Sequence, residues 1–200
     1  MTDGQCRELP PDGRMGPGTV VDFDTGRTAQ PARFGVGVIL GCHCVVERGA
    51  VLGNRVQLDH FCRVGAGSEL GADTRLLYGA QVFEDASIGE RCVIGGPVDD
   101  RTVIESDVTY MGSMAHSYRT PGTLEDWDTV EQPSPVIRRG AVIGQNALLI
   151  GPVEIGPGAY VAAGEIVRSN VPANTVLMRG ERRPIEDFRG MVTARLRADH

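Results

Sequence analysis

The feature that most limits how this chain can fold is an apolar residue at every sixth position. A period of six matches neither the 3.6-residue period of a helix nor the two-residue period of an open sheet. Repetition at one fixed period is instead typical of stacked units that bury a shared core. The anchor residues of this repeat are Phe34, Leu40, Val46, Leu52, Leu58, Val64, Leu70, Leu76, Val82, Ile88 and Ile94, then, after a short slip, Val98, Ile104 and Tyr110, and finally Ile137, Ile143, Leu149, Ile155, Val161 and Val167.

The residue four places after each anchor is small or apolar, as at Val38, Cys44 and Ala50, so each hexad supplies two inward positions. Glycine often follows the anchor directly, as at Gly53 and Gly65, and we expect a sharp turn there. Three hexads then close one triangular coil. The sequence therefore predicts a solenoid.

This pattern resembles that of the hexapeptide-repeat transferases, and the likeness covers roughly residues 34 to 170. The resemblance implies an all-β fold, a left-handed parallel β-helix of three-sided coils. We expect an N-terminal cap at 1–33, the β-helix at 34–172 with an extruded loop at 111–135, and a tail at 173–200. Apolar residues after Pro184 recur at helical spacing, which predicts a C-terminal capping helix.

Composition excludes several classes of partner. The formal charge is −6, every basic residue is an arginine, and no segment clusters basic residues as a nucleic-acid footprint would. No apolar stretch is long enough to span a bilayer, and the first residues are polar, so we expect a soluble, cytoplasmic protein with no membrane partner. Cys44, Cys62 and Cys92 occupy inward positions and are interpreted as core filler in a reducing compartment.

Residues 137–172 resemble the last coils of the maltose, galactoside and xenobiotic acetyltransferase group, including the tail Val167-Arg168-Ser169-Asn170-Val171-Pro172. The resemblance implies a homotrimer that transfers acetyl from acetyl-CoA to a hydroxyl or amine, without a metal. A histidine precedes the extruded loop in that group, and His116 occupies the matching place here. Imidazole titrates near neutral pH, which suits a general base that deprotonates the acceptor. Cofactor contacts in the group correspond to Gln145, Ala163 and Arg168.

Acidic residues on the hexads before His116 are candidates for orienting its ring or binding the acceptor: Asp99, Asp100, Glu105 and Asp107. Tyr118 and Trp127, within the loop, either pack over the acceptor or anchor the loop on a neighbouring subunit. Residues 117–135 contain one arginine and four acidic residues, a net charge of −3. The expected substrate is therefore a small polar acceptor, such as a sugar or an aminoglycoside-like compound, that carries a positive group.

Two other functions remain open at this point. The γ-class carbonic anhydrases share the repeat and bind zinc through three histidines, two of them spaced as H-x4-H, but no such pair occurs here. Cys42 and His60 do fall in one column of the predicted coils, continued by Tyr78. The second alternative is a non-catalytic scaffold, because the tryptophan and the threonine-lysine pair of the acetyltransferase group are replaced by Val142 and by Arg168-Ser169.

Overall fold

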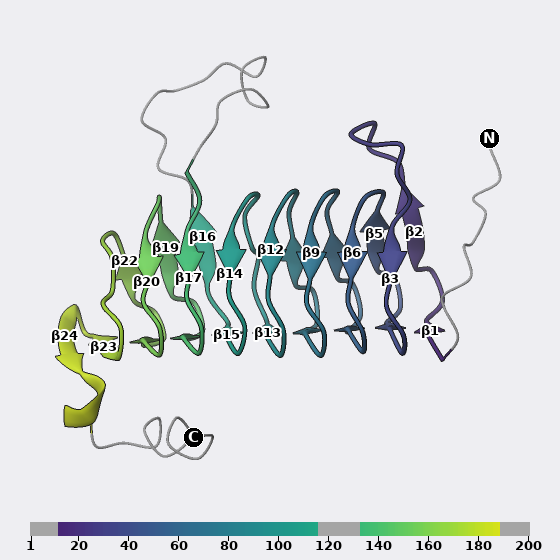
Figure 1. Cartoon of the computed structure of the whole chain (residues 1–200). Coiled ribbons are helices and arrows are strands. Elements are labelled where there is room, and N and C mark those ends of the chain that lie inside the picture. Colours follow the sequence, from purple (N-terminus) through teal and green to yellow (C-terminus); the bar gives the residue numbers. More distant parts are fainter. Residues whose placement is uncertain (1–11, 116–132, 189–200) are drawn as a thin grey trace.

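The chain forms a three-sided prism of stacked coils (Figure 1). On each side, the strands run across the prism axis and pair in parallel with strands of the neighbouring coils. The computed structural model describes residues 12–115 and 133–188. Strands that pair on one face differ by 18 in residue number over the regular coils, as Gln57 and Arg75 do. This is the left-handed parallel β-helix that the six-residue period predicted.

Three faces follow one another in chain order. Face 1 contains β1 (Arg14–Met15), β4 (Ile39–Leu40), β7 (Gln57–Leu58), β10 (Arg75–Leu76), β13 (Val93–Ile94), β15 (Thr109–Tyr110), β18 (Val142–Ile143), β21 (Tyr160–Val161), β23 (Thr175–Met178) and the antiparallel β24 (Glu181–Pro184). Face 2 contains β2 (Val20–Phe23), β5 (Val45–Glu47), β8 (Arg63–Val64) and β11 (Gln81–Val82), then β16 (Ser113–Ala115), β19 (Leu148–Ile150) and β22 (Ile166–Val167). Face 3 contains β3 (Arg33–Phe34), β6 (Val51–Leu52), β9 (Glu69–Leu70), β12 (Ser87–Ile88), β14 (Val103–Ile104), β17 (Val136–Ile137) and β20 (Glu154–Ile155).

The core is the column of anchor residues that the repeat predicted. Every anchor from Leu40 to Val167 is at most 2% exposed, and Phe34 packs against the core from the first regular coil. The small residues four places later are buried as well. Where such a residue is polar, as at Thr74, its hydroxyl is hydrogen-bonded: it donates to the carbonyl of Gly89 at 2.8 Å. One continuous apolar column therefore holds the coils together.

The turn expected at the glycine after each anchor lies two residues further along. The backbone enters the left-handed region three places after the anchor, at Gly49 with φ 81° and even at Phe61 with φ 61°. Gly53, which directly follows an anchor, serves close packing instead, because a Cβ there would lie 2.8 Å from the backbone nitrogen of Ala72 in the next coil. Stacked backbones, rather than turn geometry, therefore explain these glycines.

Within the described residues, three four-residue steps interrupt the six-residue period. Val98 and Met114 take the anchor place on face 2 only four residues after Ile94 and Tyr110, and Val171 does so on face 3 after Val167. The first step matches the slip seen in the sequence. The second means that residues 111–115, expected in the loop, belong to a coil, with Met114 only 8% exposed.

The N-terminal and C-terminal segments add to the prism. Strands β1 and β2 pair in parallel with the first regular coil, and β23 continues face 1 beyond β21 before turning back into β24. After Pro184 the structure contains a short 3-10 helix, η1 (Ile185–Asp187). The rest of the predicted capping helix, with Val192 and Leu196, lies outside the described residues.

Two segments leave the prism at one edge, the corner where face 2 turns into face 3. Residues 24–32 project there between β2 and β3 (Figure 1). The connection from β16 to β17 departs from the same corner, and residues 116–132 within it lie outside the described residues. Any site built by these two segments therefore lies along this corner, which we call corner 2–3.

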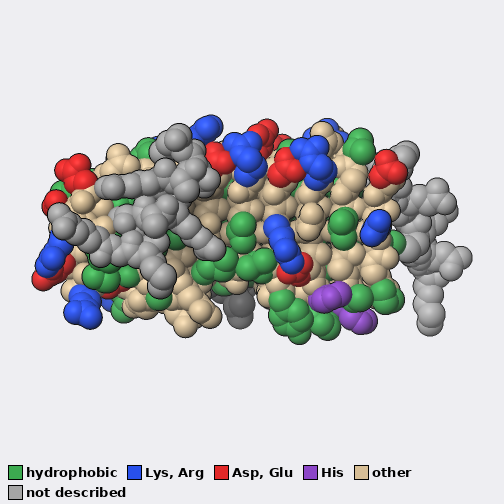
Figure 2. Space-filling model, turned by 90° about the horizontal axis from the view of Figure 1, so that it is seen from below, with side chains coloured by type: hydrophobic (Ala, Val, Ile, Leu, Met, Phe, Trp, Pro, Cys, Tyr) green, Lys and Arg blue, Asp and Glu red, His purple; other side chains and the backbone are tan. Residues whose placement is uncertain are grey.

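The other two corners differ sharply in chemistry, as Figure 2 shows along the two edges of face 1. At corner 3–1, Arg55 pairs with Asp73 at 2.6 Å and Arg91 pairs with Asp107 at 2.6 Å, which alternates charge from coil to coil. At corner 1–2, the ring of His43 stacks on Phe61, with centroids 5.3 Å apart. Tyr78 meets Phe61 edge-on.

Candidate functional site

The β16–β17 connection is anchored at both ends on corner 2–3. Ala115 ends β16, and its carbonyl accepts a hydrogen bond from the backbone N–H of Gly151 at 2.8 Å. On the other side, the Ser134 hydroxyl donates to the carbonyl of Asp100 at 2.6 Å. The predicted residues His116, Tyr118 and Trp127 lie outside the described residues.

The strands that flank this connection expose an apolar strip on face 2. In β16, β19 and β22 the inward residues are Met114, Leu149 and Val167, all buried. Their neighbours therefore point outward, and three of them are aliphatic. This strip consists of Leu148, Ile150 and Ile166, the last of which is 55% exposed.

Two predicted cofactor residues border the strip at corner 1–2. Gln145 and Ala163 are both exposed and occupy turns of neighbouring coils, where the N–H of Gly164 donates to the carbonyl of Gln145 at 3.0 Å. A Cβ on Gly144 would lie 2.5 Å from the nitrogen of Ala163, so the two turns are in close backbone contact. The structure therefore brings Gln145 and Ala163 together.

The third predicted cofactor residue borders the strip on its other side. Arg168 follows β22 and continues the outward column of Ala115 and Ile150 onto corner 2–3. Its side chain is exposed and makes no hydrogen bond or ion pair to any other residue in the described part of the chain. A guanidinium in that situation can meet an anion without first losing a protein partner.

The acidic candidates separate onto two corners. Asp100 lies at the base of the connection and pairs with Arg101 at 2.9 Å. Glu105 and Asp107 lie away from it on corner 3–1. A hydrogen bond from Arg138 lowers the pKa of Glu105, and one from Arg91 lowers the pKa of Asp107. Both carboxylates are thus ionised and already occupied by arginines, whereas Asp100 alone of the three borders the connection.

The column of Cys42, His60 and Tyr78, the alternative metal site in the sequence, contains an internal hydrogen bond. The Nδ1 atom of His60 accepts a hydrogen bond from the backbone N–H of Cys42 at 2.9 Å, so this lone pair is not available to a cation. Within residues 12–115 and 133–188, no three His, Cys, Asp or Glu side chains gather in a way that could hold a metal ion.

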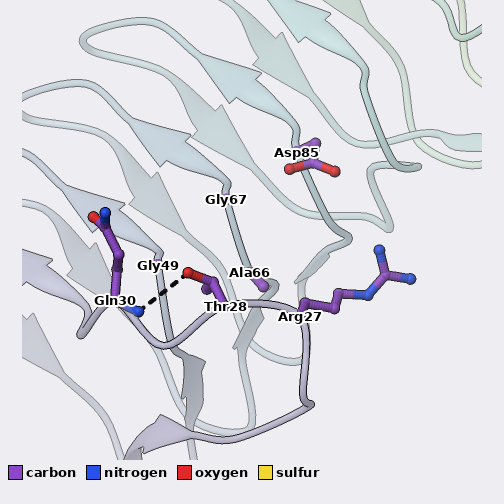
Figure 3. Close-up of a pocket in the computed structure, with 7 residues that line it drawn as sticks. All are labelled: Arg27, Thr28, Gln30, Gly49, Ala66, Gly67 and Asp85. Carbon is purple, nitrogen blue, oxygen red and sulfur yellow. Dashed lines mark hydrogen bonds between the residues drawn. The ribbon is translucent and has the colours of Figure 1, made fainter.

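Two features near corner 2–3 were not foreseen. The first is Glu47, which is 1% exposed and whose carboxylate accepts a hydrogen bond from Arg63 at 2.6 Å. The same guanidinium also pairs with Glu84 at 2.7 Å. The signal in the sequence was a charged residue directly after the anchor Val46. The second is a groove beside residues 24–32 (Figure 3), whose only signal was a glycine at equivalent turn positions of two coils, Gly49 and Gly67.

Repeat and architecture together define this chain as a hexapeptide-repeat β-helix protein. No family model matches it. It is 30% identical over 155 residues to the bifunctional protein GlmU of Burkholderia multivorans, covering 72% of this chain and 34% of that protein. The GlmU of Paramagnetospirillum magneticum is 28% identical over 180 residues, which is 85% of this chain and 40% of the relative. The chain thus spans well under half the length of these relatives.

Among solved structures, the polySia-specific acetyltransferase NeuO superposes with a TM-score of 0.52 at 16% identity, over 87% of this chain and 80% of that one. At this identity the likeness shows a shared fold. In the part of the chain that the structure describes, no helix has the length and apolarity needed to cross a membrane.

Proposed function

We propose that this protein is an acyltransferase that moves acetyl from acetyl-CoA to a hydroxyl or amine of a small polar acceptor. The observation that carries the proposal is the apolar strip Leu148, Ile150 and Ile166, which lies between the turns of Gln145 and Ala163 and the corner from which the β16–β17 connection departs. The shared fold with an acetyltransferase supports the same class of reaction.

The strip fits the donor in shape and chemistry. A pantetheine arm is a long chain with few charges, and aliphatic side chains stabilise it by removing apolar surface from water. Its amide groups can bond to the exposed turn backbone at Gln145 and Ala163. Arg168, at the other border of the strip, would meet a phosphate of the nucleotide part with its guanidinium.

Chain connectivity ties the candidate base to this strip. His116 directly follows Ala115 in the sequence, and Ala115 belongs to the outward column that contains Ile150 and Arg168. In the proposed reaction the imidazole takes the proton of the acceptor O–H or N–H as the oxygen or nitrogen attacks the thioester carbonyl. A backbone N–H stabilises the resulting oxyanion, and the carbon–sulfur bond then breaks to release the CoA thiolate. Acceptor and donor are bound together, so no covalent acyl-enzyme forms.

The finer assignments belong to the same proposal. The chain would work in the cytoplasm as a homotrimer whose sites lie between neighbouring prisms. It would resemble the maltose, galactoside and xenobiotic acetyltransferase group in its reaction. Asp100 is best placed to contact the acceptor, because it borders the connection. Tyr118 and Trp127 would pack over the acceptor or on the next subunit, and Glu105 and Asp107 would act only if their arginine partners released them.

The deciding experiment measures donor binding and transfer separately. Acetyl-CoA should raise the melting temperature of the purified protein, because a ligand that binds only the native state stabilises it. Against a panel of amino-sugar and neutral-sugar acceptors, His116→Ala should lose on the order of 10²- to 10⁴-fold in rate while binding acetyl-CoA unchanged. His43→Ala, on the distant aromatic corner, serves as the matched control. Absence of both stabilisation and transfer would refute the proposal.

A further inference from the structure

Corner 1–2 exposes large apolar side chains on successive coils. Phe61 is 50% exposed and Tyr78 is 68% exposed. Further along the same corner, Leu77 and Met111 both lie over Gly95: a Cβ added at Gly95 would overlap the sulfur of Met111 and would lie 3.4 Å from a methyl carbon of Leu77. We call Phe61, Leu77, Tyr78 and Met111 the aromatic edge.

The aromatic edge follows the prism axis. Figure 2 shows hydrophobic and histidine side chains gathered along this edge of face 1 in its N-terminal half, opposite the charged side chains of corner 3–1. Three coil steps of about 4.8 Å separate Phe61 from Met111, so the aromatic edge extends over about 14 Å. A single exposed apolar side chain is ordinary, but a continuous row of four indicates a surface that a partner covers.

Charged side chains are almost absent from this corner. Its turns in the described coils are residues 16–19, 41–44, 59–62, 77–80, 95–97, 111–112, 144–147 and 162–165. They contain no arginine and only two acidic residues, Asp59 and Glu165. Asp59 pairs with Arg75 at 2.9 Å, and the carboxylate of Glu165 accepts a hydrogen bond from the backbone N–H of Gly180 at 3.1 Å. The acidic groups of this corner are therefore already bonded within the chain.

The way the rings stack argues against a small ring-shaped ligand. The ring of His43 lies between the backbone of Gly18, where a Cβ would overlap it, and the ring of Phe61, with centroids 5.3 Å apart. Tyr78 meets Phe61 at an interplanar angle of 63°. A nucleobase or a sugar needs a free aromatic face on which to stack, and here the rings occupy one another's faces. A lipid surface would need basic residues beside the apolar ones, which these turns lack.

A second copy of this chain fits the aromatic edge better. The cores of protein interfaces are enriched in Phe, Tyr and Met and depleted of charged residues. Each copy carries a formal charge of −6, so two copies repel each other wherever their acidic residues face, and this nearly uncharged corner lets them approach. A corner of a three-sided prism is convex, so one partner covers only one of its flanks. In a ring of three copies each corner packs between the two others.

We propose that copies of this chain associate through the aromatic edge, three of them around a common axis parallel to the prisms. The number of copies rests on the homotrimer of the proposed function, whereas the choice of surface rests on the aromatic edge itself. Gln145 and Ala163 belong to the same corner, and the apolar strip lies on the adjoining face 2. Association through this corner therefore places a neighbouring prism beside the surface proposed for the donor.

Sedimentation of the full-length protein tests the proposal. The wild type should sediment with three chain masses, and both Tyr78→Arg and Phe61→Arg should sediment as monomers at the same concentration, because each would place an unpaired guanidinium in an apolar contact. Val36→Arg is the matched control, since Val36 is 58% exposed on corner 3–1, and it should remain trimeric. A monomeric or dimeric wild type, trimers in both edge variants, or equal dissociation of Val36→Arg would overturn the proposal.

A second measurement uses the unaltered sequence, so it does not depend on how well a variant folds. Chains with ¹³C-labelled methionine methyl groups are assembled with unlabelled chains, and isotope-filtered NOEs are recorded. The methyl group of Met111 should show NOEs to aromatic protons of an unlabelled copy. A trimeric sample without such NOEs would place the interface elsewhere and overturn the proposal. His43→Ala truncates the supporting ring without adding a charge and should stay trimeric.

Two further readouts separate this proposal from its alternatives. A monomeric wild type that sediments with vesicles of phosphatidylcholine and phosphatidylserine would identify a lipid surface as the partner and would overturn the proposal. If Tyr78→Arg dissociated the trimer but acetyl-CoA stabilised neither form, the interface would stand and the acyltransferase would fall. Stabilisation by acetyl-CoA together with trimeric edge variants would do the reverse.

Discussion

Gly96 lies directly against the carbonyl oxygen of Gly112 in the neighbouring coil, with no room between them for a side chain. These glycines stand in the two steps where the chain passes from face 1 to face 2 in four residues instead of six. Tyr110 fills the interior here, and its hydroxyl donates to the carbonyl of Pro97 at 2.8 Å. The two corners that are shorter by two residues are thus held together by direct contact between the backbones of neighbouring coils.

Gly96→Ala should therefore destabilise the protein by roughly 3 kcal/mol, because the added methyl must displace backbone atoms. Urea unfolding measures the change. Gly140→Ala is the control: its φ is 68°, but nothing lies within 4 Å of an added Cβ, so only the backbone strain of about 1–2 kcal/mol is expected. Equal losses in the two variants would contradict the close contact.

The buried carboxylate of Glu47 should matter more than an exposed one. Glu47→Ala leaves the buried N–H of Ala66 without its acceptor and leaves Arg63 with Glu84 as its remaining carboxylate partner. Leaving a buried donor without an acceptor costs about 1–3 kcal/mol, and the loss of one of the two carboxylates that Arg63 bonds adds to this. Glu69→Ala, at an exposed position on face 3, should change the free energy of unfolding by less than about 0.5 kcal/mol. A similar small change for Glu47→Ala would show that Glu47 is not paired as described.

The charged corner predicts how stability depends on pH. Hydrogen bonds from Arg55 and Arg91 lower the pKa values of Asp73 and Asp107, below the usual 3.8. A carboxyl group whose pKa is lower in the folded state than in the unfolded state stabilises the fold at any pH above its unfolded-state pKa. This stabilisation is lost as the pH falls through its folded-state pKa. The melting temperature should thus fall below about pH 4, and less steeply in Asp73→Asn. High salt should also weaken the dependence, because exposed pairs are screened. An identical acid limb in Asp73→Asn would rule out a contribution from this pair.

The apolar strip predicts where donor binding can be disrupted. Ile166→Glu places a carboxylate on the strip, which both removes apolar contact and repels the phosphates of CoA. The affinity for acetyl-CoA, measured by calorimetry, should fall about tenfold or more, equivalent to about 1.4 kcal/mol. Val103→Glu makes the same change at a partly exposed site on face 3 and should leave the affinity unchanged. If both variants bound acetyl-CoA normally, the donor would lie elsewhere.

Much of the fold could be predicted because inward positions follow directly from the period. The anchors Leu40 to Val167 are buried as expected, as are the small residues four places later. The prediction was wrong at 111–115, because a four-residue step removes the position that marks the next hexad and looks like the end of the repeat. The β23–β24 hairpin was missed for the same reason, after the short step at Val171.

Less of the candidate site could be predicted, because its residues come from separate coils. The proximity of Gln145 and Ala163 followed from their 18-residue spacing. The groove did not, since it depends on how residues 24–32 pack over Gly49. The sequence also did not predict the separation of the acidic residues. Asp100 is close in sequence to Glu105 and Asp107 but lies on a different corner of the prism.

By itself the sequence determined the prism, its core and the order of its faces, because a six-residue apolar period has only one way to bury its anchors. The tertiary structure alone decided which charged groups meet. Arg55 pairs 18 residues ahead with Asp73, but Arg91 pairs 16 residues ahead with Asp107. The two-residue shortening between them changes the register of every later coil, and partners across coils are set by that register rather than by distance along the chain.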